Sequence, residues 1–359
     1  MKFLSFRGTK PPVAIAVTIL AGTLGGALCA LAGLPAAWLS GSLVVVTLLA
    51  VAGYPVALPE SFRRIVFILL GISMGSAVTP ETIAGVWTWP ISLGLLALSL
   101  PVTMLGATLY LRWAGWERDA SLYASAPGAL SAVLALAYAT GADVRKVAFA
   151  QSSRVFFIIA ALPGALALLG ISTAGAAATP WLAFGSGWDL LLMAVFGFAG
   201  GVIAERFSVP GGLIIGAMLA SAVLHGSGYV TARVPQLIQV PCFIALGAFI
   251  GVRFVGTDFK LLRRLFVHSL GAFIVAAVIC VLFAWVAAFA AGESFGKTTL
   301  AFAPGALEAM IILAFLLDLD PAFVGAHHIA RFLLIAIFLP LVARAWYGKI
   351  NGGGGGTTD

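Results

Sequence analysis

The sequence predicts an all-α polytopic membrane protein, built as two inverted-topology repeats with a broken or re-entrant helix in each. Of its 359 residues, 62% are hydrophobic and only 9% are charged, which excludes an ordinary soluble domain. Apolar runs of about 18 residues or more, the length that crosses roughly 30 Å of hydrocarbon, follow one another from Pro12 to Ala345. An internal duplication is the third observation behind this prediction.

The duplication is clearest where Ala126–Pro163 aligns with Ala303–Pro340 without a gap, at an offset of 177 residues and with fourteen of 38 positions identical. Both copies open with APGAL, and both carry an Arg in the following apolar segment. Matching Gly residues extend the similarity upstream. The predicted organisation is a first repeat at 1–171, a linker at 172–187, a second repeat at 188–349 and a disordered tail at 350–359.

Each repeat contains six apolar segments, and the fifth carries the APGAL motif. In the first repeat the segments lie near 13–33, 36–54, 62–79, 87–111, 121–141 and 146–170. In the second they lie near 188–206, 210–227, 235–255, 263–291, 298–317 and 322–346.

The Lys and Arg residues predict how these segments cross the membrane. If all twelve cross, the basic loop at 253–264 falls outside. If each fifth segment instead enters and returns on one side, each repeat has about five crossings and the second repeat is inverted. Sixteen loop or tail Lys and Arg then lie inside and two outside, Arg233 and Lys297. We therefore favour the inverted repeat, although a run of about 22 residues is also long enough to cross.

The Pro-Gly step of each APGAL motif predicts a central cavity. Such a step frees backbone hydrogen-bonding groups, and within hydrocarbon these are tolerated only where protein or a water-filled cavity satisfies them. Short helices that begin after the breaks, at Ala129 and Ala306, would present N–H groups and positive dipole ends able to hold an anion. Interrupted helices that meet near the midplane are typical of secondary-transporter sites.

Arg154 and Arg331 each follow a predicted capping residue, Asp143 or Asp320, by eleven positions. At 1.5 Å per residue both Arg lie roughly 16 Å deep, near the bilayer midplane, where an unpartnered charge is costly. Two interpretations stay open and are compatible. Each Arg either neutralises the carbonyl end of a broken helix or pairs with Glu308, or both Arg contribute to an organic-anion site.

Glu308 has no acidic counterpart, because Ser131 occupies the equivalent position. Both a coupling proton and a static salt bridge are open interpretations of this carboxyl group. His327 and His328 point about 100° apart on a helix, which favours a proton relay or polar lining over a metal site, with packing or a carbonyl hydrogen bond as the remaining interpretation. We expect no metal and no cofactor. The predicted substrate-binding residues are Pro127, Gly128, Ala129, Ser131, Gln151, Arg154, Pro304, Gly305, Ala306, Glu308, His328 and Arg331, and the predicted coupling residues are Glu308 and His327.

A duplicated half with PGAL in its fifth segment and an Arg in its sixth resembles the bacterial membrane family called AbrB. The resemblance covers nearly the whole chain, and members have been labelled ammonia monooxygenases or regulators of gene expression. It implies two AbrB-type repeats in the bacterial inner membrane. The count of Lys and Arg predicts that both termini are cytoplasmic. Copper or iron chemistry needs clustered His and carboxylates, whereas this chain has four His in three segments. Direct regulation through DNA would need a basic soluble module, which we do not find.

We therefore expect a secondary transporter of a small organic anion or an amino-acid-like solute, coupled to protons or sodium. The alternative is a membrane sensor that acts indirectly on gene expression, and a membrane oxidoreductase is less favoured. The protein is not expected to be an enzyme. Its expected partners are an anionic small molecule and the lipid bilayer, not nucleic acid, and a homodimer is suggested by analogy with other carriers.

Overall fold

The computed structural model describes residues 11–76, 87, 89–128, 130–170, 181–182, 185–256 and 259–347. Every regular element within these ranges is a helix, so the all-α class is confirmed. Most of the predicted linker and the whole predicted tail lie outside the described residues.

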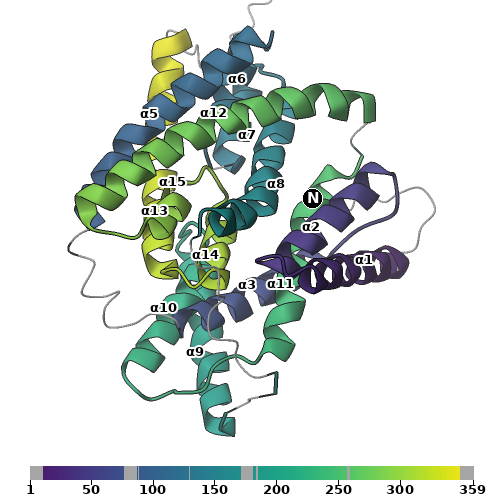
Figure 1. Ribbon diagram of the computed structural model, residues 1–359, viewed down its shortest axis with the longest axis vertical. Coiled ribbons are helices and arrows are strands. Elements are labelled where there is room, and N and C mark those ends of the chain that lie inside the picture. The colour runs from purple at the N-terminus through teal and green to yellow at the C-terminus, as the bar shows by residue number, and fades with distance from the viewer. Residues whose placement is uncertain are drawn as a thin grey trace, which may run out of the picture.

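The helices follow the same order in the two halves of the chain (Figure 1). The first half contains α1 (Pro11–Leu31), α2 (Ala37–Val51), α3 (Glu60–Gly75), α5 (Trp89–Trp113), α6 (Arg118–Ser125), α7 (Leu130–Ala139) and α8 (Val144–Leu168). The second contains α9 (Gly187–Arg206), α10 (Gly212–Gly226), α11 (Gln236–Gly251) with the 3₁₀ turn η2 (Val252–Phe254), α12 (Phe259–Ala291), α13 (Phe295–Phe302), α14 (Leu307–Leu316) and α15 (Pro321–Tyr347). Each of the twelve predicted apolar segments therefore contains at least one helix.

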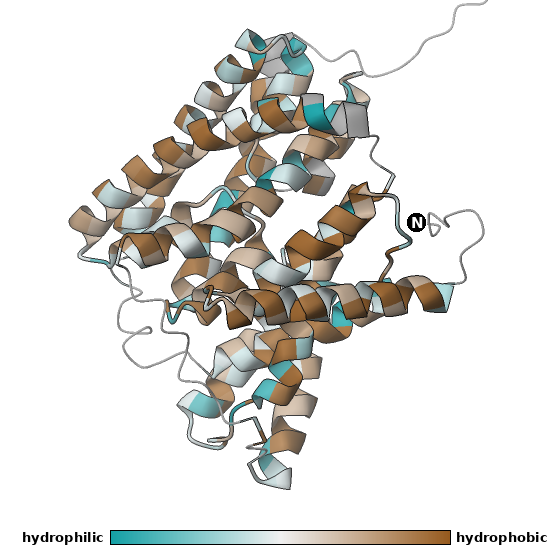
Figure 2. Cartoon of the chain, turned by 45° about the vertical axis from the view of Figure 1, so that its right-hand side comes forward, coloured by the Kyte–Doolittle hydropathy of each residue, from teal (hydrophilic) through white to brown (hydrophobic). Residues whose placement is uncertain are grey.

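Seven helical spans in the described part of the chain are long and apolar enough to cross a membrane. They are Pro11–Leu31, Trp89–Trp113, Val144–Leu168, Gly187–Arg206, Gln236–Phe254, Leu265–Ala291 and Pro321–Leu339. Large apolar side chains such as Leu24 on α1 and Phe289 on α12 are exposed, and Figure 2 shows apolar residues along the outer helices. An exposed apolar surface of this extent needs lipid around it, so the chain is a multi-pass membrane protein.

Helices from the two halves pack against one another in matching pairs. Within each half the first two helices are partners, α1 with α2 and α9 with α10. Across the halves α2 packs against α11 and α10 packs against α3, while α5 lies beside α12 (Figure 1). The halves are therefore interleaved and do not form separate domains.

Two glycines permit the close contacts between halves. A Cβ atom on Gly71 of α3 would lie 2.4 Å from the carbonyl oxygen of Ile214, and one on Gly247 of α11 would lie 2.4 Å from that of Leu39. Inside lipid, helices associate through such close packing because no hydrophobic drive exists between them. These glycines therefore fix how α3 and α11 meet the opposite half.

Both APGAL segments are broken helices, as the sequence predicts. One break separates α6 from α7, and Gly128 adopts a φ of 94° there, a conformation that other residues rarely take. The other break separates α13 from α14, across Ala303–Ala306. Each break therefore leaves one helix C-terminus and one helix N-terminus inside the protein.

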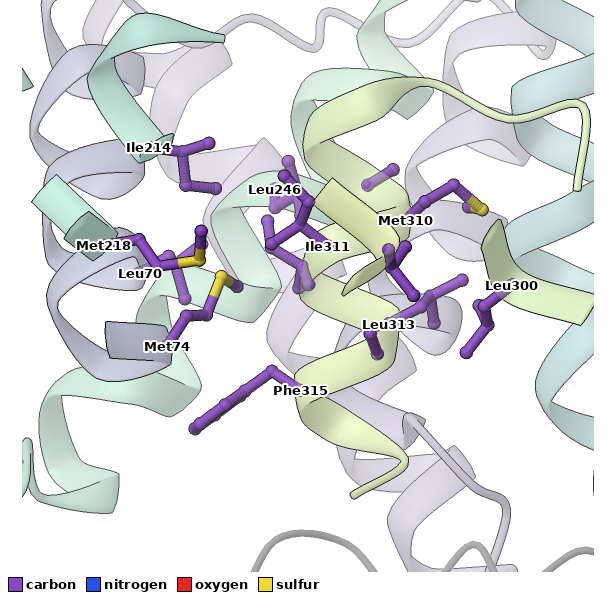
Figure 3. Packing of buried hydrophobic residues seen from close by; sticks show 14 of the residues in the cluster. Leu70, Met74, Ile214, Met218, Leu246, Leu300, Met310, Ile311, Leu313 and Phe315 are labelled. Carbon is purple, nitrogen blue, oxygen red and sulfur yellow. The ribbon is translucent and has the colours of Figure 1, made fainter. Parts of the chain in front are cut away.

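The second broken helix is anchored by the hydrophobic core. Residues 310–314 of α14 are fully buried, and Ile311 belongs to a cluster with Leu70 of α3 and Ile214 of α10. Figure 3 shows α14 between the α3 and α10 side chains and Leu300 of α13. The N-terminal end of α14 is thus held in one position in the centre of the molecule.

Candidate functional site

A cavity of about 430 Å³ lies between the two broken helices. Its wall takes residues from the first break, including Pro127 and Gly128, and from the second, including Gly305 and Ala306. The two APGAL motifs, far apart in the sequence, therefore border one space. This volume falls in the range of small-molecule sites.

Two side chains from α8 form hydrogen bonds with the backbone at the first break. Arg154 donates from Nη1 to the carbonyl oxygen of Ala124 at 3.4 Å and from Nη2 to that of Ala126 at 3.0 Å. The Gln151 amide donates to the carbonyl oxygens of Tyr123 at 3.0 Å and Ala126 at 2.8 Å, and its own oxygen accepts from Arg154. These bonds satisfy carbonyl groups that the end of α6 leaves without helical partners.

The second break is completed in the same way by α15. Arg331 donates from Nη2 to the carbonyl oxygen of Ala301 at 2.8 Å and from Nη1 to that of Ala303. His328 contacts the carbonyl oxygen of Leu300 through Nε2, at 3.1 Å. Every residue in these contacts lies 177 positions after its counterpart at the first break, so the bonding pattern follows the sequence duplication.

The start of each supporting helix sets the depth of its Arg. Asp143 accepts from the backbone N–H groups of Arg145 at 3.0 Å and Lys146 at 3.2 Å, which caps α8. Asp320 accepts from Ala322 at 3.0 Å and Phe323 at 3.1 Å, which caps α15. Both predicted caps are confirmed. The Arg and the polar residue three positions before it then share one helix face.

The cavity wall carries three cationic side chains, Arg154, Arg253 and Arg331, and one carboxylate, Glu308. Arg154 and Arg331 are buried, with 7% and 2% of their surface exposed. Glu308 is half-buried, and among the described residues it forms no hydrogen bond or ion pair. The predicted pairing of Glu308 with Arg154 or Arg331 is therefore absent in this conformation.

Nine predicted site residues line the cavity: Pro127, Gly128, Gln151, Arg154, Gly305, Ala306, Glu308, His328 and Arg331. Pro304 lies in the second break but is not part of the wall. Ala129 lies outside the described residues, as does the side chain of Ser131.

His327, a predicted coupling residue, lies away from the cavity. Its Nδ1 is 2.8 Å from the carbonyl oxygen of Phe323 and its Nε2 is 2.8 Å from the Ser92 hydroxyl on α5. The ring also packs on Phe323, with 4.0 Å between centroids. The arrangement makes His327 a packed contact between α15 and α5.

Sequence reasoning missed seven residues of the cavity wall: Leu130, Val155, Pro210, Gly211, Arg253, Leu307 and Phe332. Gly211 caps α10 with a φ of 64°, and its counterpart Ala36 caps α2 with a φ of 51°. The paired motifs VPGG and LPAA were a usable signal, because Pro and Gly there mark a special backbone. Arg253 gave no such signal, since in the sequence it looks like one more basic loop residue.

The described residues contain no group of three or more His, Cys, Asp or Glu side chains arranged to hold a metal ion. The Nε atoms of Arg154 and Arg331 are buried and have no hydrogen-bond partner. Polar chemistry at this site therefore centres on the two guanidinium groups, the freed backbone and Glu308.

An apolar helical shell around a polar cavity at two broken helices defines a multi-pass membrane protein with a central polar site. The chain belongs to the AbrB family, because residues 38–347 match the family model described as "Transition state regulatory protein AbrB".

Two relatives match most of the chain. One, named "Putative regulator AbrB", is from Escherichia coli (strain K12) and is 26% identical over 313 residues, which cover 87% of this chain and 90% of the relative. The other, named "Uncharacterized protein YhjN", is from Bacillus subtilis (strain 168) and is 26% identical over 347 residues, which cover 88% of each chain. No solved structure matches significantly.

Proposed function

We propose that the protein is a secondary transporter of a small organic anion or an amino-acid-like solute in the bacterial inner membrane, driven by protons or sodium. The observation that carries this proposal is the single cavity shared by both broken helices, with two buried Arg in its wall. Broken helices beside a central polar cavity are how many secondary transporters bind their solutes.

The proposal includes two inverted repeats, with both termini cytoplasmic. The count of Lys and Arg supports the inversion and the cytoplasmic termini, and matching hydrogen bonds at the two breaks and matching helix pairs support the repeat. So does the contact between the Thr103 hydroxyl and Cys280, whose sulfur lies 3.7 Å away. These residues are also 177 positions apart, as equivalent positions would be where a two-fold axis passes between α5 and α12.

In this proposal each buried Arg has two roles. Its Nη groups hold the end of a short helix, and its charge attracts the anionic solute into the cavity. Glu308 is the proposed coupling group, because it is the one carboxylate of the cavity wall in the described residues and forms no hydrogen bond or ion pair there. A carboxyl group that is free to bind and release a proton can link solute movement to a gradient.

A second candidate is a membrane sensor that binds the same solute without moving it. The name of the Escherichia coli relative, "Putative regulator AbrB", favours this candidate. Both candidates predict that the solute binds in the cavity, but only the transporter predicts that it moves across the membrane.

Counterflow in proteoliposomes tests the proposal. The purified chain is reconstituted with a high internal concentration of unlabelled solute, and entry of the labelled solute is followed. We expect entry that Arg154→Ala and Arg331→Ala abolish and that the exposed control Arg206→Gln retains. Saturable binding without counterflow would support the sensor and contradict the transporter.

A further inference from the structure

Within the described part of the chain, the two buried Arg of the cavity have no acidic partner. Arg154 forms its hydrogen bonds with two backbone carbonyls and the neutral Gln151, and Arg331 forms its bonds with two backbone carbonyls. No ion pair of the described residues includes either Arg. Buried charges in proteins are normally paired, because an unpaired one costs several kcal/mol of desolvation.

The helix ends at the breaks do not remove this excess charge. A helix C-terminus carries roughly half a negative charge, which offsets part of the guanidinium that contacts it. The next helix begins at the same break with roughly half a positive charge, as α14 does five positions after the last residue of α13. The two ends largely cancel, so about one positive charge remains at each break.

The other two charged groups of the wall also cancel. Arg253 on η2 is exposed and Glu308 on α14 is half-buried, and together they contribute no net charge. The wall therefore has a net charge of three Arg minus one Glu, or +2. Both excess charges lie on the buried guanidinium groups.

We propose that the solute is a dianion, and that small dicarboxylates are its chemical class. This inference rests on the proposed function and names its substrate class. One carboxylate faces each guanidinium group, so the solute supplies the two counter-ions that the described residues do not provide. Each Arg has five N–H donors, of which Arg154 uses three and Arg331 uses two in the bonds described above. Unused donors therefore remain for carboxylate oxygens.

Matched ligands of equal size test the charge of the solute. The full chain in nanodiscs is titrated with succinate, glutarate and adipate, and with their monoamides succinamate, glutaramate and adipamate, at constant ionic strength. We expect at least one dicarboxylate to bind about tenfold or more tightly than its monoamide. Raising the salt concentration should weaken the dicarboxylate more than the monoamide.

Variants of Arg331 test whether the buried charge causes the preference for dicarboxylates over their monoamides. Arg331→Gln should bring the two affinities within about twofold of one another, because one counter-ion is no longer needed. Arg331→Lys keeps the charge and should keep the preference for the dicarboxylate over its monoamide. This variant tests the role of the charge if Arg331→Gln does not fold. Arg206→Gln removes an exposed Arg of α9 and should leave the preference unchanged.

Two results would contradict the proposal that the solute is a dianion. Equal affinity for dicarboxylates and monoamides would do so and would leave an anion transporter in place, with a monoanionic solute. Failure of all six compounds to bind the folded protein would also reject this class, whereas the transporter itself fails only if counterflow fails.

Discussion

At the scale of single residues, the structure confirms that the buried Arg bind the carbonyl ends of broken helices, and the organic-anion site stays a proposal. Both guanidinium groups hold carbonyl ends of broken helices, and both line the cavity. Their depth could be predicted from the distance to Asp143 and Asp320, because a capped helix has a fixed rise. Their carbonyl partners could be proposed only as a class, since contacts between distant helices depend on packing that the sequence does not display.

Gln151 provides a residue-scale test of the cap at α6. Gln151→Leu removes two donors from buried carbonyl oxygens at similar side-chain volume, so we expect about 2–3 kcal/mol less stability. Thermal unfolding in detergent measures the loss. The control is Thr23→Val, which removes an exposed side-chain bond to the carbonyl oxygen of Ile19 and should change stability by less than about 0.5 kcal/mol. Equal effects of the two changes would contradict this role of Gln151.

Glu308→Gln tests coupling. The change removes the ionisable proton and keeps the side-chain size, so we expect solute accumulation driven by a pH gradient to fall at least tenfold while counterflow persists. Uptake and counterflow in the same proteoliposomes measure both quantities. If gradient-driven accumulation survives intact in Glu308→Gln, the coupling proton is not carried by this group.

At the scale of helices, the positions of the helices along the sequence could be predicted well, whereas the contacts between helices could not. Hydropathy located all twelve segments, and the Pro-Gly steps located both breaks. The N-terminal end of α10 reaches the cavity through Pro210 and Gly211, and Arg253 reaches it from η2. These contacts arise because α3 and α11 each pack against a helix of the opposite half. Patterns of neighbouring residues in the sequence do not predict such contacts between distant helices.

The glycines at those crossings carry an element-scale prediction. Gly71→Ala and Gly247→Ala each force a Cβ atom to 2.4 Å from a backbone oxygen, so we expect a loss of about 1–3 kcal/mol in each case. The matched control is Gly94→Ala in α5, where a Cβ meets nothing within 4 Å. That change should be neutral or should stabilise the helix by up to about 1 kcal/mol. Thermal unfolding that ranks all three alike would contradict the close helix contacts.

At the scale of the whole molecule, the duplication is the strongest signal that the sequence contains. An offset of 177 residues relates the two motifs in the sequence, and it also relates the hydrogen bonds at the two breaks. The count of Lys and Arg predicts opposite orientations for the two repeats in the membrane. Orientation depends on the bilayer and on charge asymmetry across it, so it needs a measurement in membranes.

Cysteine labelling in intact cells tests that orientation. In a background without Cys29, Cys242 and Cys280, we expect Arg145→Cys to resist a membrane-impermeant thiol reagent applied outside. Ser294→Cys, at the start of α13, should react, because the inverted repeat places this turn on the opposite side. Labelling of the two positions from the same side would exclude the inverted arrangement.

The proposed transport requires as its central claim that the cavity between the two broken helices opens to each side of the membrane in turn. Ala306→Cys in the same cysteine-free background tests it most directly, because this residue lies in the second break and in the cavity wall. We predict modification by an impermeant thiol reagent from either side of the membrane, and protection from both sides by the transported anion. Modification from one side only, with or without the anion, would contradict alternating access and leave a one-sided binding site.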